Sequence, residues 1–529
     1  MLDLSKLHEA VRYEGGVSRR LMLAYTSSLA ALPLLGRSTN AAPAPKFSAD
    51  PFTLGVASGD PEDTSVVLWT RLAPKPLQPD GGMKQDAVEV RWEIAEDEAM
   101  TKVIQTGTSL ATPQLGHSVH VTVRGLKSNR WYWYRFTAGD AQSPIGRTRT
   151  MPSMADSPQR LRFAVTSCQS YEAGLFTAYE QMRADENDLV FHLGDYIYEY
   201  ASGRLGDIRK HIGPEIESLT DYRVRYSQYR SDPLLHNMHA ACPWLVTWDD
   251  HEFDNNFAND VSEQSNVDLA DFLLRRANAA QAYYEVMPLR QRSLPKGPNV
   301  QLYRKTSFGR LAELMVLDTR QYRTDQPNND RRSPLNAAAL NPENSLLGTK
   351  QRNWLYQSLL ASQGTWNVLA QQVMMGLVGQ AAANGQANYS MDQWPGYAAE
   401  RAQLLQFIKD RRVPNPVVLT GDIHSNWANE LRVDDRQPDE PLVATEFVTT
   451  SLSSGGNGPE EVRNLDKLMR ENPCVKFHNQ QRGYVRCTVT PKTWTSDYMV
   501  CDDVIRPGGK TNVKKSLVVE AGNPAIENA

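Results

Sequence analysis

Six apolar segments of this sequence each end in polar residues of the kinds that bind metal ions or phosphate. The segments lie far apart, and their ends carry Ser167-Cys168, Asp195 with Tyr198, Asp249-Asp250-His251-Glu252, Asp318 with Arg320 and Arg323, Gln371-Gln372, and Asp422 with His424. Each apolar run has the length and composition of a buried β-strand. Because ligands of layered α/β proteins bind outside the carboxyl ends of strands, we expect these six ends to meet in one site.

These side chains form a mixed set of ligand types. Tyrosinate and thiolate are electron-rich anions that favour Fe(III), whereas carboxylate and amide oxygens suit Ca²⁺ or Mn²⁺. Taken singly the signals are weak, because Gly194-Asp195 fits a turn, Cys168 fits a packing position and TWDDHE (247–252) fits a helix start. Their shared position behind apolar segments indicates a site for two kinds of metal ion.

Two regions of different pattern position these residues. Residues 50–150 contain short alternating segments such as VEVRWEIA and RWYWYRFTA, separated by turn residues, which predict a β-sandwich of about a hundred residues. From residue 160 onward, longer apolar runs such as DLVFHLGD and NPVVLTGDIH alternate with helical or irregular stretches. This second region is typical of a layered α/β domain, and the alternating region carries no cluster of ligand types.

Composition limits the classes of function. The chain has 529 residues, of which 40% are hydrophobic and 22% charged, and its net charge is −4. Such a chain is long enough for two or more domains and offers no general electrostatic case for binding nucleic acid or an anionic membrane. Five cysteines are too few for a disulfide scaffold, and no segment after the N-terminus is long enough for a transmembrane helix.

The N-terminus is predicted to be an export signal. Arg19-Arg20 precede a short, mildly apolar run, LMLAYTSSLAALPLLG, and then small residues in TNAAPAP. The run is interrupted by Pro33 and should not span a bilayer stably. Paired arginines before such a run favour a twin-arginine signal over a Sec signal or a disordered tail. We therefore expect a periplasmic or extracellular protein that engages the twin-arginine export machinery.

Several of the strand ends resemble the sequence blocks of metallophosphoesterases. GDYIY (194–198) matches their GDxxY block, DHE (250–252) resembles Asn-His-Glu, and GDIH (421–424) resembles GHxH with an aspartate for the first histidine. The whole arrangement, with VTSCQS, VLDTRQYR, DQWPGY and EFVTTSLSS, is similar to the PhoD-type alkaline phosphatase/phosphodiesterase family. The resemblance implies an α/β metallophosphoesterase core, a layered β-sandwich flanked by helices, behind an N-terminal all-β immunoglobulin/fibronectin-like domain.

The resemblance also implies a set of metal ligands. It implies that Fe(III) is held by Cys168, by Asp195 as a bridging carboxylate, by Tyr198 as a phenolate and by His424. Calcium would be held by Asp250 and Asp422, with Asp249 or Asn255 serving a second calcium ion, and Mn²⁺ is the alternative second metal. Because only one residue of the Asp249-Asp250 pair need be the ligand, the alignment with Asn-His favours Asp250.

The implied reaction is the hydrolysis of phosphate esters. Two cations would neutralise the phosphate oxygens and supply an oxide or hydroxide nucleophile. His251 is the candidate for hydrogen-bonding phosphate or protonating the leaving group, against the alternative of a structural histidine. Arg320 and Arg323 either clamp the phosphate or anchor their loop.

The implied domains are an export signal (1–44), a β-sandwich domain (45–152), a PhoD-like catalytic domain (158–515) and a C-terminal tail (516–529). The protein is then an alkaline phosphatase, acting on phosphomonoesters, phosphodiesters or both, and a monomer. Two alternatives stay open at this point: a phospholipase D-like phosphodiesterase of the same fold, and a non-catalytic iron-binding protein. Intact carboxylates in every block argue against a decayed enzyme.

Overall fold

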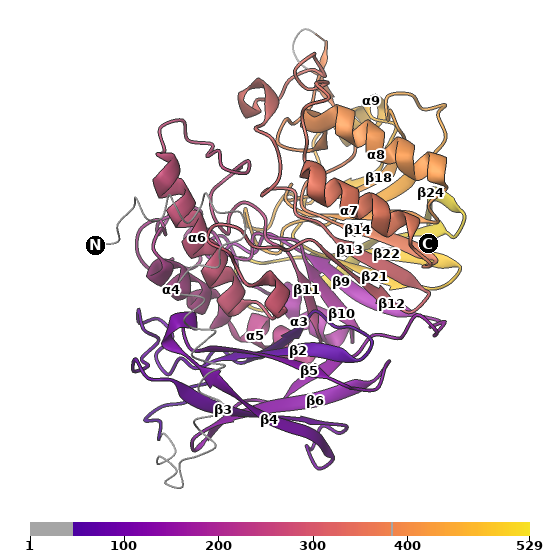
Figure 1. The fold of residues 1–529 in the computed structure, drawn as a ribbon. Helices are drawn as coiled ribbons and strands as arrows, with labels where there is room; N and C mark the ends of the chain where they lie inside the picture. Colours follow the sequence, from indigo (N-terminus) through magenta and orange to yellow (C-terminus); the bar gives the residue numbers. More distant parts are fainter. Residues whose placement is uncertain (1–45, 382–384) are drawn as a thin grey trace.

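Two large β-sheets form the centre of the molecule (Figure 1). The computed structural model describes residues 46–381 and 385–529, so the predicted export signal lies outside the described residues. One sheet has ten strands and the other seven. A buried cluster joins apolar side chains of both sheets, among them Phe163 and Phe191 from the first and Val368 and Leu419 from the second. The two sheets therefore share one core.

The ten-stranded sheet has a parallel centre. β9 (Leu161–Thr166), β10 (Leu189–His192) and β11 (Trp244–Val246) run in the same direction, so their carboxyl ends lie at one edge. Nearly all their residues are buried, as the continuous apolar runs require. Beyond β9 the sheet continues antiparallel through β21 (Gly483–Val489), β22 (Thr493–Cys501), β23 (Thr511–Glu520) and β24 (Asn523–Asn528).

The seven-stranded sheet also has a parallel centre. Its strand order is β12 (Arg304–Phe308), β13 (Ala312–Val316), β14 (Trp366–Ala370), β17 (Pro416–Thr420), β19 (Ala444–Val448), β18 (Asn426–Leu431) and β20 (Val475–Asn479). Strands β13, β14, β17 and β19 are parallel neighbours. The carboxyl ends of β13, β14 and β17 carry three of the six segments that the sequence marks for chemistry.

Helices lie against the outer side of each sheet (Figure 1). A cluster beside the ten-stranded sheet includes buried side chains of α3 (Ala178–Ala184), α4 (Leu219–Arg230), α5 (Pro233–Ala241) and α6 (Leu269–Val286). On the seven-stranded side, α7 (Gly348–Leu360) and α8 (Ala398–Arg411) contribute to a separate cluster. Side-chain caps start several of these helices, since Ser218 caps α4 and Asp268 caps α6.

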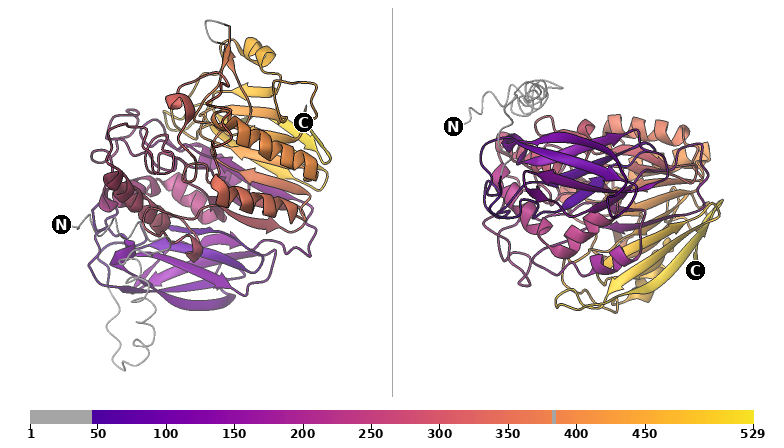
Figure 2. Two further views of the ribbon diagram at one scale, coloured as in Figure 1. Left: turned by 45° about the horizontal axis from the view of Figure 1, so that its top comes forward. Right: turned by 90° about the horizontal axis from the view of Figure 1, so that it is seen from below.

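The N-terminal strands do not form a separate block (Figure 2). Three of them, β1 (Val56–Gly59), β2 (Ser65–Arg71) and β5 (Ser118–Arg124), extend the ten-stranded sheet, because β1 pairs in parallel with β11. The other strands form a five-stranded sheet: β3 (Val88–Ala95), β4 (Val103–Ala111), β6 (Trp131–Ala138), β7 (Ala141–Gln142) and β8 (Gly146–Arg149). A buried cluster joins both sets of strands. The ten-stranded sheet therefore contains strands from both sides of the predicted domain boundary at residues 152–158.

The predicted C-terminal tail (516–529) is wrong. These residues complete β23 and form β24, and the side chains of Leu517 and Val519 are buried in the core between the sheets. The signal in the sequence is the short apolar run Leu517-Val518-Val519, which is too brief between its polar neighbours to stand out as a strand. Among the described helices, none combines the length and the apolar content that a membrane span requires.

Candidate metal centre

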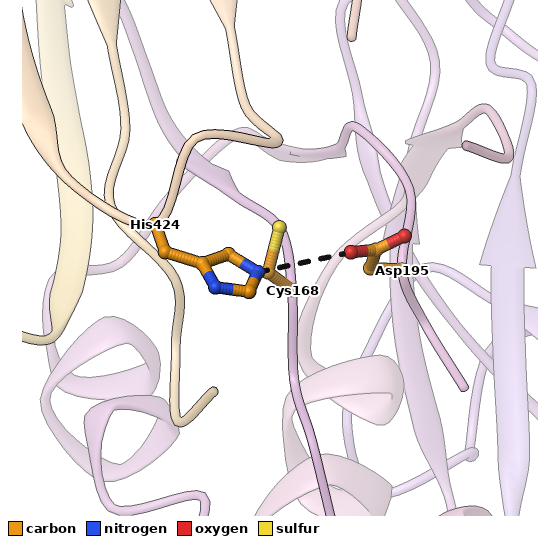
Figure 3. Close-up of side chains that lie close together, drawn as sticks. All are labelled: Cys168, Asp195 and His424. Atoms are coloured by element: carbon orange, nitrogen blue, oxygen red, sulfur yellow. Dashed lines mark ion pairs between the residues drawn. The ribbon is translucent and has the colours of Figure 1, made fainter. Parts of the chain in front are cut away.

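Four predicted ligands gather where β9, β10 and β17 end. The sulfur of Cys168, a carboxylate oxygen of Asp195 and an imidazole nitrogen of His424 all lie within 4.8 Å of one another, and Figure 3 shows the ring and the carboxylate facing each other. Tyr198 Oη lies 2.9 Å from Asp195 Oδ2 and 3.2 Å from His424 Nε2. One sulfur, one carboxylate, one phenol and one imidazole thus converge from three separate segments.

The backbone at these strand ends is strained. The left-handed residues include Cys168 (φ 58°), Asp195 (φ 54°), Asp422 (φ 63°) and His424 (φ 54°). Side chains other than glycine rarely adopt this region, and such strain persists only where surrounding contacts impose it. Gly194 is required for a second reason, because a Cβ there would lie 2.3 Å from the Cβ of Asp249. The tight turns point the ligand side chains into one space.

The chemistry of this group fits a trivalent cation. Cys168 and Tyr198 are buried, with exposed fractions of 0% and 2%, and burial followed by the charge of Asp195 raises the pKa of both side chains well above their usual values. A metal ion that binds them as anions has to displace their protons. Thiolate, phenolate and the Asp195 carboxylate would then carry three negative charges, which a trivalent ion balances.

A second group of carboxylates adjoins the first. Oxygens of Asp249, Asp250 and Asp422 lie within 4.8 Å of one another. The fully buried guanidinium of Arg320 lies among them, with Nε 2.5 Å from Asp249 Oδ1 and Nη2 2.8 Å from Asp422 Oδ1. Its Nη1 donates to both oxygens of Asp392, at 2.9 and 3.1 Å. Arg320 therefore joins three segments that are distant in the sequence.

This second group fits a divalent cation that prefers oxygen. Arg320 and Arg323 provide two positive charges against the carboxylates of Asp249, Asp250 and Asp392, which are buried, and of Asp422, which is partly buried. Burial raises the pKa of Asp422 to about 6 despite the neighbouring Arg320, as expected where carboxylates outnumber the positive charges around them. Among the described residues, Asp249 Oδ2 and Asp250 Oδ1 are buried without a hydrogen-bond partner. Two uncompensated charges and unpaired carboxylate oxygens are what a calcium-like ion requires.

His251 lies beside both groups. Its Nδ1 is 2.8 Å from Glu199 Oε2, and its ring packs 4.3 Å from the ring of Tyr198. Burial alone would lower the pKa of His251, but the carboxylates of Glu199, Asp250 and Asp195 outweigh it and raise that pKa well above its usual value. The contact with Glu199 engages Nδ1 of the imidazole and leaves Nε2 for another partner.

Other predicted residues have different surroundings. The amide of Asn255 donates to Glu263 and does not join the carboxylate group. Asp318 accepts bonds from the backbone N–H groups of Arg320 and Gln321, so it shapes the turn that carries Arg320. Arg323 is buried and donates to Asp392 and to backbone carbonyls, which favours the anchoring interpretation for it.

The two glutamines after β14 hold the strand ends together. Gln371 donates to Thr420 and accepts from Trp394, and Gln372 donates to the carbonyl of Trp248. All these side-chain bonds stay within the protein. We therefore assign both glutamines to the framework of the site.

Sequence reasoning missed several residues that contact the site, and four of them bear most directly on its chemistry. These are Glu199, Asp392, Ser454 and Arg482. Asp392 and Ser454 lie inside the blocks DQWPGY and EFVTTSLSS. The family resemblance therefore marked both segments, but it gave neither residue a function. Glu199 stands in GDYIYEY, where only the aspartate and the second tyrosine drew attention. Arg482 has no motif around it.

Comparison with known proteins identifies the family. The chain matches the family model described as PhoD-like phosphatase over residues 163–498 and its N-terminal domain model over residues 38–152. It is 50% identical, over 90% of its length and 82% of the relative's, to alkaline phosphatase D of Bacillus subtilis. A solved structure titled "Structure of PhoD" matches with a TM-score of 0.89 and 49% identity, over 92% of this chain and 93% of that one. The chain therefore belongs to the PhoD-like phosphatase family.

Proposed function

We propose that this phosphatase hydrolyses phosphate esters with Fe(III) and Ca²⁺ as its metal ions. The observation that carries the proposal is the convergence of Cys168, Asp195, Tyr198 and His424 beside a separate group of carboxylates. The first set combines soft and hard anions and is suited to Fe(III). The second set offers oxygen only and is suited to Ca²⁺, with Mn²⁺ as the alternative.

The residues divide between the two ions by position. Cys168, Tyr198 and His424 would hold Fe(III), and Asp195, which belongs to the first group and also lies near Asp250, would contribute its carboxylate to both ions. Asp250 and Asp422 would hold calcium, and the unpaired oxygen of Asp249 would make that residue a further ligand. Asn255 turns toward Glu263 and is the weakest of the predicted ligands.

The protein side chains then act on the bound ester. When present, the two ions neutralise phosphate and lower the pKa of water. His251, held at Nδ1 by Glu199, presents Nε2 to the phosphate or the leaving-group oxygen and donates its proton there. Arg320 fixes the positions of the carboxylates, and no donor of Arg323 is turned away from its protein partners to clamp phosphate.

Metal analysis with activity measurement tests this proposal. Protein purified without added metal should contain about one Fe and at least one Ca per chain, show a ligand-to-iron absorption band and hydrolyse p-nitrophenyl phosphate. Chelation should remove activity, and Fe(III) with Ca²⁺ should restore it where Zn²⁺ does not. Active protein that contains zinc only would refute the metal assignment.

The substrate remains a choice between phosphomonoesters and phosphodiesters. A phospholipase D-like phosphodiesterase is the second candidate, because the same metal groups serve both ester types. A kinetic panel of p-nitrophenyl phosphate, bis-p-nitrophenyl phosphate and a phosphatidylcholine decides between them by kcat/KM. The family membership and the relative named alkaline phosphatase disfavour the non-catalytic iron-binding alternative.

The proposal also covers the cellular location, the oligomeric state and the N-terminal region of the enzyme. Arg19-Arg20 and the run that follows support export by the twin-arginine machinery to the periplasm or the exterior. We further propose that the enzyme acts as a monomer and that residues 45–152, whose strands β1, β2 and β5 also extend the ten-stranded sheet, form an immunoglobulin/fibronectin-like region with a packing role.

A further inference from the structure

The segment after β19 has a motif that the ligands do not explain. Residues 449–454 read TTSLSS and lie along the end of β9, where Leu452 N donates to Ser167 O at 2.9 Å and Ser454 N donates to Cys168 O at 3.3 Å. The segment therefore supports the backbone at Cys168, whose φ of 58° has to be held by its neighbours.

One serine of this segment contacts two of the proposed iron ligands. Ser454 Oγ lies 2.7 Å from Tyr198 Oη and 2.7 Å from the carbonyl oxygen of Cys168. It also accepts a bond from Ser170 N at 3.0 Å. The side chain is buried, with 2% of the residue exposed, so solvent does not compete for these bonds.

The group to which the Ser454 hydroxyl donates depends on whether Tyr198 is a phenol or a metal-bound phenolate. A hydroxyl has one proton and two lone pairs. While Tyr198 is a phenol, Tyr198 donates to Ser454 or to Asp195, and Ser454 donates to the Cys168 carbonyl. A phenolate can only accept hydrogen bonds. Ser454 is then the side chain within 2.7 Å that can donate to the phenolate oxygen.

We propose that Ser454 is a positioning residue whose hydroxyl turns its proton from the Cys168 carbonyl to the Tyr198 phenolate, while the bond from Ser454 N to Cys168 O keeps the serine in place. This inference rests on the proposed iron site. A hydrogen bond to a ligating oxygen withdraws electron density from it, so the metal ion remains a stronger Lewis acid. The same bond stabilises the phenolate and raises the energy needed to transfer its electron to Fe(III). Ser454 thus links ligand geometry to the electronic character of the site.

A pair of adjacent serines provides the experiment. Ser454→Ala removes the bond to Tyr198, whereas Ser453→Ala is the matched control. Ser453 is also fully buried and donates to a backbone carbonyl, that of Ser170, at 2.9 Å, but its hydroxyl contacts neither Tyr198 nor Cys168. Ser454→Thr retains a hydroxyl and serves as the conservative variant. Iron content, visible absorption, kcat, KM and thermal midpoint are measured on all four proteins.

The expected results separate positioning from folding. Ser454→Ala should keep its iron, shift the absorption band to longer wavelength and lower kcat by about 10- to 100-fold, with little change in KM. Ser454→Thr should restore the band and most of kcat, and Ser453→Ala should change neither although its thermal midpoint falls.

Three results would overturn the inference. If Ser454→Ala has the same absorption band and kcat as the parent, Ser454 does not act as proposed. Equal changes in Ser453→Ala make the effect one of general packing. A parent protein that binds iron without such a band shows instead that Tyr198 is no ligand, which refutes the proposed iron site and the role of Ser454 together.

Discussion

The guanidinium of Arg320 is expected to supply part of the positive charge that balances the carboxylate group of Asp249, Asp250 and Asp422. It is fully buried and pairs with Asp249, Asp392 and Asp422 at 2.5 to 2.9 Å. Arg320→Met keeps most of the volume and removes the charge, which leaves Asp249 and Asp422 without their cationic partner, while Asp392 keeps Arg323. Removing one partner of a buried ion pair costs about 3–5 kcal/mol. We therefore expect metal-free Arg320→Met protein to lose about that much free energy of unfolding.

Calcium should recover part of this loss. A ligand present at a hundredfold excess over its dissociation constant stabilises the native state by about 2.7 kcal/mol. Because Arg320→Met makes the carboxylate group more negative, calcium should stabilise the variant more than it stabilises the parent. Urea unfolding with chelator and with saturating calcium, followed by fluorescence, gives both differences for both proteins.

Arg401→Met is the control for this experiment. Arg401 is also buried and pairs with an aspartate, Asp435, but it lies outside the carboxylate group. Its loss should destabilise the protein equally with and without calcium. If Arg320→Met is as stable as the parent in chelator, or if calcium stabilises both variants alike, the charge argument for Arg320 is refuted.

Three further predictions concern other parts of the chain. Cys168→Ser should lose iron, colour and about a hundredfold in turnover, whereas Cys242→Ser should keep all three, and an iron-replete, fully active Cys168→Ser protein would mean that no thiolate ligand exists. Burial lowers the pKa of His192 to about 3. Its neutral ring therefore contributes fully to stability above pH 6.5, and about 2 kcal/mol of that contribution is lost by pH 5. His192→Phe should reduce this loss, as urea titrations at pH 5 and pH 8 would measure, and an unchanged pH dependence would contradict the assignment. Replacing both Arg19 and Arg20 with lysine should leave the precursor in the cytoplasm. Mature protein that still accumulates outside at normal levels would contradict the twin-arginine assignment.

The strand ends could be predicted from sequence because two local signals coincide there. A buried parallel strand appears as a continuous apolar run, and Gly194-Asp195 and Gly421-Asp422 mark sharp turns directly after such runs. Parallel strands place their carboxyl ends at one edge, so Cys168 and Asp195 had to lie near each other once the ten-stranded sheet existed. Asp422 follows β17 of the seven-stranded sheet and reaches them through the packing of the two sheets.

The contacts around the ligands could not be predicted in this way. The bond between His251 and Glu199 joins two turns whose relative placement depends on the whole sheet. The pair of Arg320 and Asp392 likewise joins segments with no shared local pattern. The extension of the core sheet by β1 was missed because its partner, β11, lies far along the chain, and pairing between distant strands leaves no periodic signal.

The order of strands in the ten-stranded sheet has a consequence for synthesis of the protein. The sheet takes its strands from the beginning, the middle and the end of the chain, since β1 pairs with β11 and β9 pairs with β21. A ribosome releases β1 long before β11, and β21–β24 emerge last. Until then the hydrogen-bonding groups along one side of β9 lack their strand partner, and such edges invite aggregation. A nascent or truncated chain is therefore recognisable by its open strand edges, which gives a chaperone or an export machine for folded proteins a physical criterion for holding it back.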